Sequence, residues 1–256
     1  MMIRRRTLLG GIAAAGALGL AALARPARPV MAASRRSGPI VLELFTSQGC
    51  SSCPPADELL GELAQEPDVI ALAYHVDYWN YIGWEDPFSS EKMSDRQRRY
   101  GHAMKLRTIY TPQLVIDGEA DLVGSRRSLV LQELERRWAQ RGGPGLAVTL
   151  NRDGEDFELL LDAEQGADYT GAELLLVGSD DRHVTEVPRG ENRGRTLEDF
   201  AVVRFYRSLG HWDGKADRLR IPGSAVSMPT DRLSVLVQAP GNGPIHGAGV
   251  LDVRTA

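Results

Sequence analysis

Two cysteines, three positions apart, are the residues of this chain whose type and spacing could do chemistry. They stand in the run Cys50-Ser51-Ser52-Cys53 and are the only 2 cysteines among the 256 residues. Two thiols at this spacing can close into a disulfide and exchange it with the thiols of another protein. We expect Cys50 to be the nucleophile that forms a mixed disulfide with the substrate, and Cys53 to resolve that disulfide by attacking Cys50.

The residues around the pair predict a strand, a turn and a helix, in that order. The apolar run 40–45 has the length of a strand, the polar residues 46–49 form a turn, and leucines recur at helical spacing after Pro54 and Pro55. Prolines are tolerated in the first turn of a helix, where the backbone N–H groups have no partner within the helix. The positive helix end stabilises a thiolate and lowers its pKa from about 8.5 to roughly 3.5–7.5. We expect Cys50 to be the more exposed sulfur.

The rest of the chain divides at a glycine-rich break, residues 142–145. Before the break, the apolar run 69–76 predicts a second strand parallel to the first, and a proline-led hairpin and a helix follow a charged, helix-compatible stretch. After the break, short strands alternate with turns, which is typical of a β-sandwich. We therefore assign residues 37–141 to one domain and residues 145–256 to a second.

The first 33 residues predict a cleavable export signal. Arg4-Arg5-Arg6 precede a Gly/Ala/Leu run, Met31-Ala32-Ala33 offers a cleavage site, and the paired arginines resemble a twin-arginine signal. The apolar run of about 17 residues is short for a membrane span. We expect a periplasmic or secreted protein with no stable membrane insertion after cleavage. Removal of the five arginines in this segment changes the net charge from −4 to −9, which argues against nucleic acid as a partner.

The order of elements resembles the thioredoxin fold, in which a strand leads to Cys-x-x-Cys at a helix start and a Thr-Pro pair, here Thr111-Pro112, opens a hairpin. The resemblance implies an α/β thioredoxin-like domain with a helical insertion, followed here by an all-β sandwich-like domain. It also implies that Pro112 is cis and that Thr111 and Pro112 hold the substrate strand. The runs 43–57, 75–79 and 189–192 resemble the exported thioredoxin-like family DUF1223. That family has no settled biochemical role.

Glu43 is a carboxylate inside an otherwise apolar strand, where burial is costly unless the group is paired or protonated. Thioredoxin-like enzymes keep a buried acid on the same strand, six residues before the first cysteine, to move the proton of the second. Glu43 lies seven residues before Cys50, and a shift of one residue turns a strand side chain to the other face. A proton relay and a structural or surface role therefore both stay open.

His75 and the aromatic residues after it carry a second set of alternatives. A zinc site built from His75 and the two cysteines lacks an evident fourth ligand, so we predict no metal site. Trp79, Tyr81 and Trp84 either roof the cysteine pair as a peptide-binding groove or simply pack the insertion onto the sheet.

These observations predict a periplasmic thiol–disulfide oxidoreductase that acts on protein disulfides. Its partners would be protein thiols and disulfides together with an unidentified redox partner protein, and it would need no cofactor beyond the cysteine pair. Two alternatives stay open: a non-catalytic exported binding module with a structural Cys50–Cys53 disulfide, and a copper or zinc carrier. The oxidoreductase prediction requires a reachable sulfur near residue 50. Two sulfurs buried away from solvent would leave only an exported two-domain scaffold.

Overall fold

The computed structural model describes residues 38–141, 146–163, 168–215 and 217–254. The predicted export signal (1–33) and the predicted break (142–145) lie outside these ranges. The strands are β1 (Ile40–Thr46), β2 (Val69–His75), β3 (Gln113–Ile116), β4 (Ala120–Val123), β5 (Leu146–Asp153), β6 (Asp156–Ala163), β7 (Glu173–Glu186), β8 (Thr196–His211), β9 (Arg218–Ile221), β10 (Arg232–Gln238) and β11 (Ile245–Asp252). The α-helices are α1 (Pro54–Leu63), α2 (Glu91–Ala103) and α3 (Arg127–Gln140), with short 3-10 turns η1 (Asn80–Ile82) and η2 (Gly223–Ala225).

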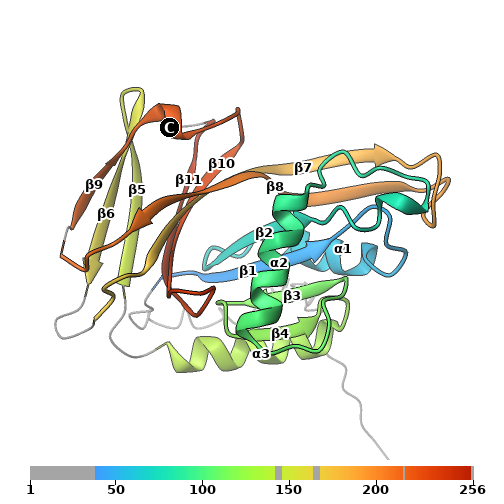
Figure 1. Ribbon diagram of the computed structural model, residues 1–256, viewed down its shortest axis with the longest axis horizontal. Helices are drawn as coiled ribbons and strands as arrows, with labels where there is room; N and C mark the ends of the chain where they lie inside the picture. The colour runs from blue at the N-terminus through green and yellow to red at the C-terminus, as the bar shows by residue number, and fades with distance from the viewer. Residues whose placement is uncertain (1–37, 142–145, 164–167, 216, 255–256) are drawn as a thin grey trace, which may run out of the picture. The chain divides into compact units, whose positions relative to one another are not determined.

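One mixed sheet of eight strands runs through both halves of the described chain, in the order β11-β10-β7-β8-β2-β1-β3-β4 (Figure 1). Strands β1 and β2 are parallel, with Thr46 opposite His75. Strand β3 continues the sheet antiparallel to β1. On the other side β8 joins β2, where Val202 lies opposite Ala73. Strands β5, β6 and β9 form a second sheet of three strands.

The predicted fold class, an α/β thioredoxin-like domain with a helical insertion followed by an all-β sandwich-like domain, is wrong. The described part of the chain is mostly β, and its large sheet contains strands from before and after residues 142–145. The cause is the length of β7 and β8, which have 14 and 16 residues. One end of this antiparallel pair bonds to β10, and β8 also reaches β2. Local sequence patterns predict strands, but they do not say which remote strand each one will join.

Strand β1 is covered on both faces of the sheet, and all seven of its residues are buried. Successive side chains of a strand point to opposite faces. Leu44 packs with Leu60 of α1 on one face, and Phe45 packs with Tyr100 of α2 on the other. In Figure 1, α2 crosses the sheet in front of β1 and β2, opposite α1. The chain leaves this buried strand at Thr46 and enters the cysteine turn directly.

The three-stranded sheet packs against the other end of the large sheet through a separate apolar core. Leu146 and Leu159 of the small sheet share this core with Leu176 of β7 and Val235 of β10. None of the helices in the described ranges is long and apolar enough to cross a membrane.

Candidate functional site

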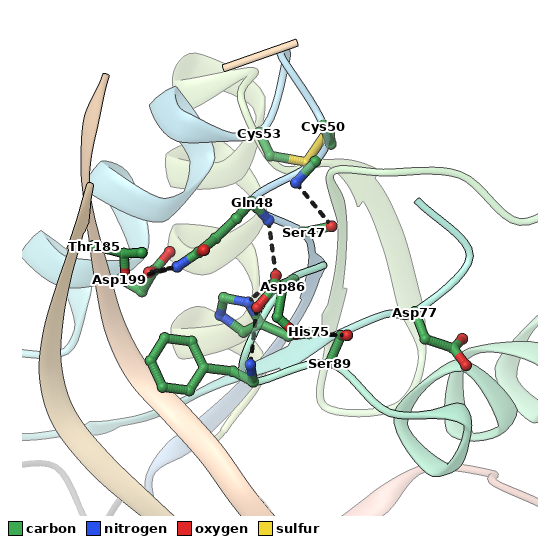
Figure 2. A network of polar contacts seen from close by, with 12 residues as sticks. Ser47, Gln48, Cys50, Cys53, His75, Asp77, Asp86, Ser89, Thr185 and Asp199 are labelled. Carbon is green, nitrogen blue, oxygen red and sulfur yellow. Dashed lines mark hydrogen bonds and ion pairs between the residues drawn. A yellow bond between two sulfur atoms is a disulfide. The ribbon is translucent and has the colours of Figure 1, made fainter. Parts of the chain in front are cut away.

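The cysteine pair forms a disulfide at the start of α1, with the two Cα atoms 5.4 Å apart (Figure 2). Cys53 is the N-cap of the helix, and the two prolines occupy its first positions, as the sequence predicts. The amides of Ala56 and Asp57 both donate to the Cys53 carbonyl, at 2.8 and 3.2 Å. The second sulfur is therefore carried by the residue that begins the helix.

Both cysteines are buried, which contradicts the expectation that Cys50 lies exposed on the turn. Cys50 is 1% exposed and Cys53 is 0% exposed, whereas Ser51 and Ser52 between them are exposed. Trp79 packs against the residue before Cys50, because a Cβ atom added to Gly49 would lie 3.0 Å from the Trp79 Cβ. The accessibility that the oxidoreductase prediction requires is absent from this conformation.

The turn between β7 and β8, residues 187–195, which we call the strap, is hydrogen-bonded to the cysteine turn. The buried side-chain amide of Asn192 donates to the carbonyl oxygens of Gln48 at 2.9 Å and Cys50 at 3.1 Å. The neighbouring Glu191 carboxylate accepts from the Ser51 backbone amide at 3.3 Å and from its hydroxyl at 2.6 Å. The run 189–192, which the sequence singles out as a family motif, thus holds the cysteine turn by side-chain hydrogen bonds.

Gln48 anchors the turn, and both polar atoms of its side chain make hydrogen bonds. Its amide nitrogen donates to Thr185 at 3.0 Å and to Asp199 at 2.7 Å, and its amide oxygen accepts from Trp84 at 3.0 Å. Its backbone N–H donates to Asp86 at 2.8 Å. In the view of Figure 2, Gln48 lies between the disulfide and the His75–Asp86 pair. The turn before the disulfide is therefore anchored to β7 and β8 as well as to β1.

His75 and Asp86 form a buried ion pair under this turn, with Nδ1 and Oδ2 2.7 Å apart. Burial by itself would lower the pKa of His75, but the Asp86 carboxylate and its hydrogen bond outweigh burial and raise that pKa to about 9. Burial opposes ionisation of Asp86 as well, yet His75 and the amides of Gln48 and Phe88 hold the pKa of Asp86 below its usual range. Both groups are therefore charged at neutral pH.

The other ring nitrogen of His75, Nε2, has no hydrogen-bond partner among the described residues. The described ranges contain no group of three or more His, Cys, Asp or Glu residues arranged to hold a metal ion.

Asp57 is a buried acid that the sequence analysis did not single out. It lies in the first turn of α1, four residues after Cys53, and burial, reinforced by Asp199 and Asp86 against the opposing charge of His75, raises its pKa to about 8. At neutral pH its carboxyl group is therefore mostly protonated. The sequence could have predicted this burial, because Asp57 lies three residues before Leu60 and therefore on the apolar side of the helix pattern.

A groove of about 620 Å³ runs between α1 and the first half of β8, and both Asp57 and Asp199 line it. Burial also raises the pKa of Asp199. The groove brings these two acids to a surface that is open to solvent.

Thr111 and Pro112 lie immediately before β3, joined by a cis peptide bond as the resemblance implies. The Thr111 hydroxyl accepts a hydrogen bond from the indole nitrogen of Trp79 at 2.8 Å. Since the Cβ atom of Trp79 also lies close to Gly49, Trp79 connects the Thr-Pro pair to the cysteine turn.

Glu43 lies on the face of β1 that α2 covers, and it is fully buried. Its carboxylate pairs with the guanidinium of Arg96, with Nε and Oε1 2.7 Å apart, and accepts a hydrogen bond from Tyr100. Arg96 is itself stacked near three tyrosine rings. The contacts of Glu43 thus lead into the core of the α2 face, and its role in proton transfer stays a prediction.

Comparison with known proteins shows that the chain matches one protein family and resembles two solved structures. The family model described as "Protein of unknown function (DUF1223)" matches residues 41–238. The crystal structure of protein AGR_C_4864 from Agrobacterium tumefaciens is 30% identical, covers 85% of this chain and 95% of its own, and gives a TM-score of 0.73. HBP35 of Porphyromonas gingivalis shares the fold at 11% identity, with a TM-score of 0.61, over 88% of this chain and 78% of its own. A search of curated proteins gave no match.

Proposed function

We propose that this chain, which belongs to the DUF1223 family of proteins of unknown function, is a thiol–disulfide oxidoreductase that exchanges Cys50–Cys53 with protein thiols. The single observation that carries the proposal is Asp57, a buried carboxyl group one helical turn beyond the disulfide with a pKa of about 8. The export-signal pattern of residues 1–33 supports a periplasmic or secreted location, where disulfides persist.

The exchange needs only two thiols on the substrate protein and the disulfide on this chain. A substrate thiolate attacks the Cys50 sulfur, a new S–S bond forms there, and the Cys50–Cys53 bond breaks with its electron pair on the Cys53 sulfur. The second substrate thiolate then attacks the first substrate sulfur and displaces Cys50. Two electrons and two protons have passed from the substrate to this chain, and a redox partner protein with a disulfide of its own takes them away. Run in reverse, the same steps reduce a substrate disulfide.

These steps require a proton donor for the Cys53 sulfur inside a buried site, and Asp57 can be that donor. The Cys53 sulfur, which is 0% exposed, leaves as an anion in a buried position, and a protonated carboxyl group one helical turn away can donate a proton to it. A buried carboxyl group is costly for stability, and a purely structural disulfide at the start of α1 does not require a proton donor. Perturbed acids of this kind are concentrated at functional sites.

The burial of both sulfurs means that the strap must move before a substrate sulfur can reach Cys50. The strap holds the turn by polar contacts from Asn192 and Glu191, and its residues 188–191 and 193–195 are exposed or only partly buried. Segments held by few apolar contacts open at a fraction of the free energy of global unfolding. Exchange thus proceeds through a strap-open state.

The test compares Asp57→Asn with Glu58→Gln, an exposed acid on the same turn of α1. Exchange with a reduced model protein is followed from pH 5 to 9 by acid quenching and mass spectrometry. We expect Asp57→Asn to slow exchange about 100-fold at pH 7, the lower end for loss of a general acid, and to remove the dependence on a group of pKa about 8. Glu58→Gln should behave as the wild type. Equal rates in all three proteins would refute the role of Asp57.

A second candidate function is favoured by one observation, the burial of Cys50 and Cys53 at 1% and 0% exposure. In this alternative the disulfide is permanent and the chain is an exported binding module. The reduction potential decides between the two, because structural disulfides have potentials below about −300 mV. Equilibration of the native chain with dithiothreitol measures it, and a potential above that value supports the oxidoreductase.

A further inference from the structure

The strap places a carboxylate inside the loop that separates the two cysteines. The Glu191 carboxylate lies 2.6 Å from the Ser51 hydroxyl and 3.3 Å from the Ser51 amide, and both groups donate to the same oxygen. Ser51 is exposed and next to Cys50 in the chain. Ser51 therefore forms a carboxylate-binding position next to Cys50, the residue that a substrate would attack. Glu191 of this chain occupies that position.

Arginines flank Glu191 in the strap. The strap contains Arg189, Arg193 and Arg195, all exposed, against Glu191 as its single acid. Arg195 donates to the side-chain oxygen of Asn192 at 3.0 Å. The side chains of Arg189 and Arg193 have no hydrogen-bond or ion-pair partner among the residues that the structure describes. The strap is thus locally positive in a chain whose net charge is −4.

The surface beside the arginines has room for a polypeptide segment. A shallow hollow is lined by Ile82, Pro188 and Gly190 together with Arg189, Glu191 and Arg193. These residues combine apolar contact area with positive charge on one open surface.

We propose that this surface, the strap arginines with Ser51, binds an acidic segment of the protein substrate, whose carboxylate replaces that of Glu191 on Ser51. The proposal rests on the proposed function. Arg189 and Arg193 attract the segment, since a local field of opposite sign raises the rate of encounter. Displacement of Glu191 releases one of the two residues by which the strap holds the turn, so binding of an acidic substrate also helps to expose Cys50. The specificity is for acidic residues next to a reactive cysteine.

The experiment uses the oxidised full chain and three short peptides, each with one cysteine flanked by two Asp, two Asn or two Lys residues. Loss of the Cys50–Cys53 disulfide is measured by acid quenching, alkylation and mass spectrometry at low salt. The test variant is Arg189→Glu/Arg193→Glu. The matched control is Arg136→Glu/Arg218→Glu, which makes the same change in net charge at exposed arginines of α3 and β9. For each peptide, the ratio of wild-type to variant rate cancels the intrinsic reactivity of the peptide thiol.

We expect the test variant to slow the Asp peptide about tenfold, to leave the Asn peptide within about twofold, and to speed the Lys peptide, while the control changes none of them. Glu191→Gln removes the charged competitor for Ser51 and should speed the Asp peptide more than the Lys peptide. Equal effects of the test variant on all three peptides, or equal effects of test and control variants, would overturn the proposal. A disulfide that none of the three peptides reduces refutes the proposed function itself, and the acidic-substrate inference with it.

Discussion

Substitution of Asn192 by alanine should speed reduction of the disulfide, because this side chain holds the strap closed. Its amide donates two hydrogen bonds, to Gln48 and Cys50, and is buried. A hydrogen bond contributes roughly 0.5–1.5 kcal/mol net, so the loss of two makes strap opening easier by about 2 kcal/mol. Since 1.4 kcal/mol is a factor of ten, the strap-open population and the rate of reduction should rise roughly 30-fold.

The assay is the rate of reduction by excess dithiothreitol under native conditions, sampled by acid quenching and alkylation. Asn151→Ala, at an exposed position on β5, is the matched control and should react at the wild-type rate. Asn192→Asp keeps the shape of the side chain but sets an anionic acceptor against two carbonyl oxygens, and it should react at least as fast as the alanine variant. If Asn192→Ala loses stability in urea yet is reduced at the wild-type rate, the strap does not control access.

The remaining predictions concern stability measured by urea unfolding. With the pKa of His75 raised to about 9 and that of Asp57 to about 8, the folded chain keeps protons that the unfolded chain loses. Stability should therefore fall as pH rises, between about pH 4 and 8 through Asp57 and between about pH 6.5 and 9 through His75, by up to about 1.4 kcal/mol per pH unit for each group. A rise in stability across these ranges would contradict the shifts. Gly61→Ala should destabilise by about 1–3 kcal/mol, despite the better helix propensity of alanine, since its Cβ would meet the Phe200 ring at 2.6 Å; a more stable variant would disprove that contact. Glu43→Gln should cost about 3–5 kcal/mol by leaving a buried guanidinium unpaired, and an unchanged Cys50 titration would exclude the proton relay.

The conflict between a redox motif and a buried disulfide has a physical resolution in the nature of the cover. The strap meets the cysteine turn through two hydrogen bonds that Asn192 donates and two that the Glu191 carboxylate accepts from Ser51, and these can be exchanged for hydrogen bonds to water or to a substrate. An apolar lid would have to expose its buried surface in order to open, at a cost proportional to area. The strap residues that hold the cysteine turn, Asn192 and Glu191, are polar, so their release exposes little apolar surface. This suits a site that must be closed at rest and open during exchange.

The sequence by itself determined the local features of the site. The apolar run before the turn became β1, the two prolines became the first residues of α1, and the cysteines met in a disulfide at the helix start. These outcomes depend on residues within about two helical turns of one another. Hydrophobic periodicity and proline geometry act over that range, so they can be read without knowledge of the fold.

Only the tertiary structure decided what surrounds the disulfide. Asn192 is 142 positions from Cys50, β8 joins β2 through a single pairing, and the pKa of Asp57 depends on charges from other elements of the chain. Burial and electrostatics are properties of the packed molecule, because they arise from whichever remote residues the fold brings close. The residue types could therefore predict thiol chemistry, while the closed strap, the protonated acid and the contact of Glu191 with Ser51 came from long-range packing alone.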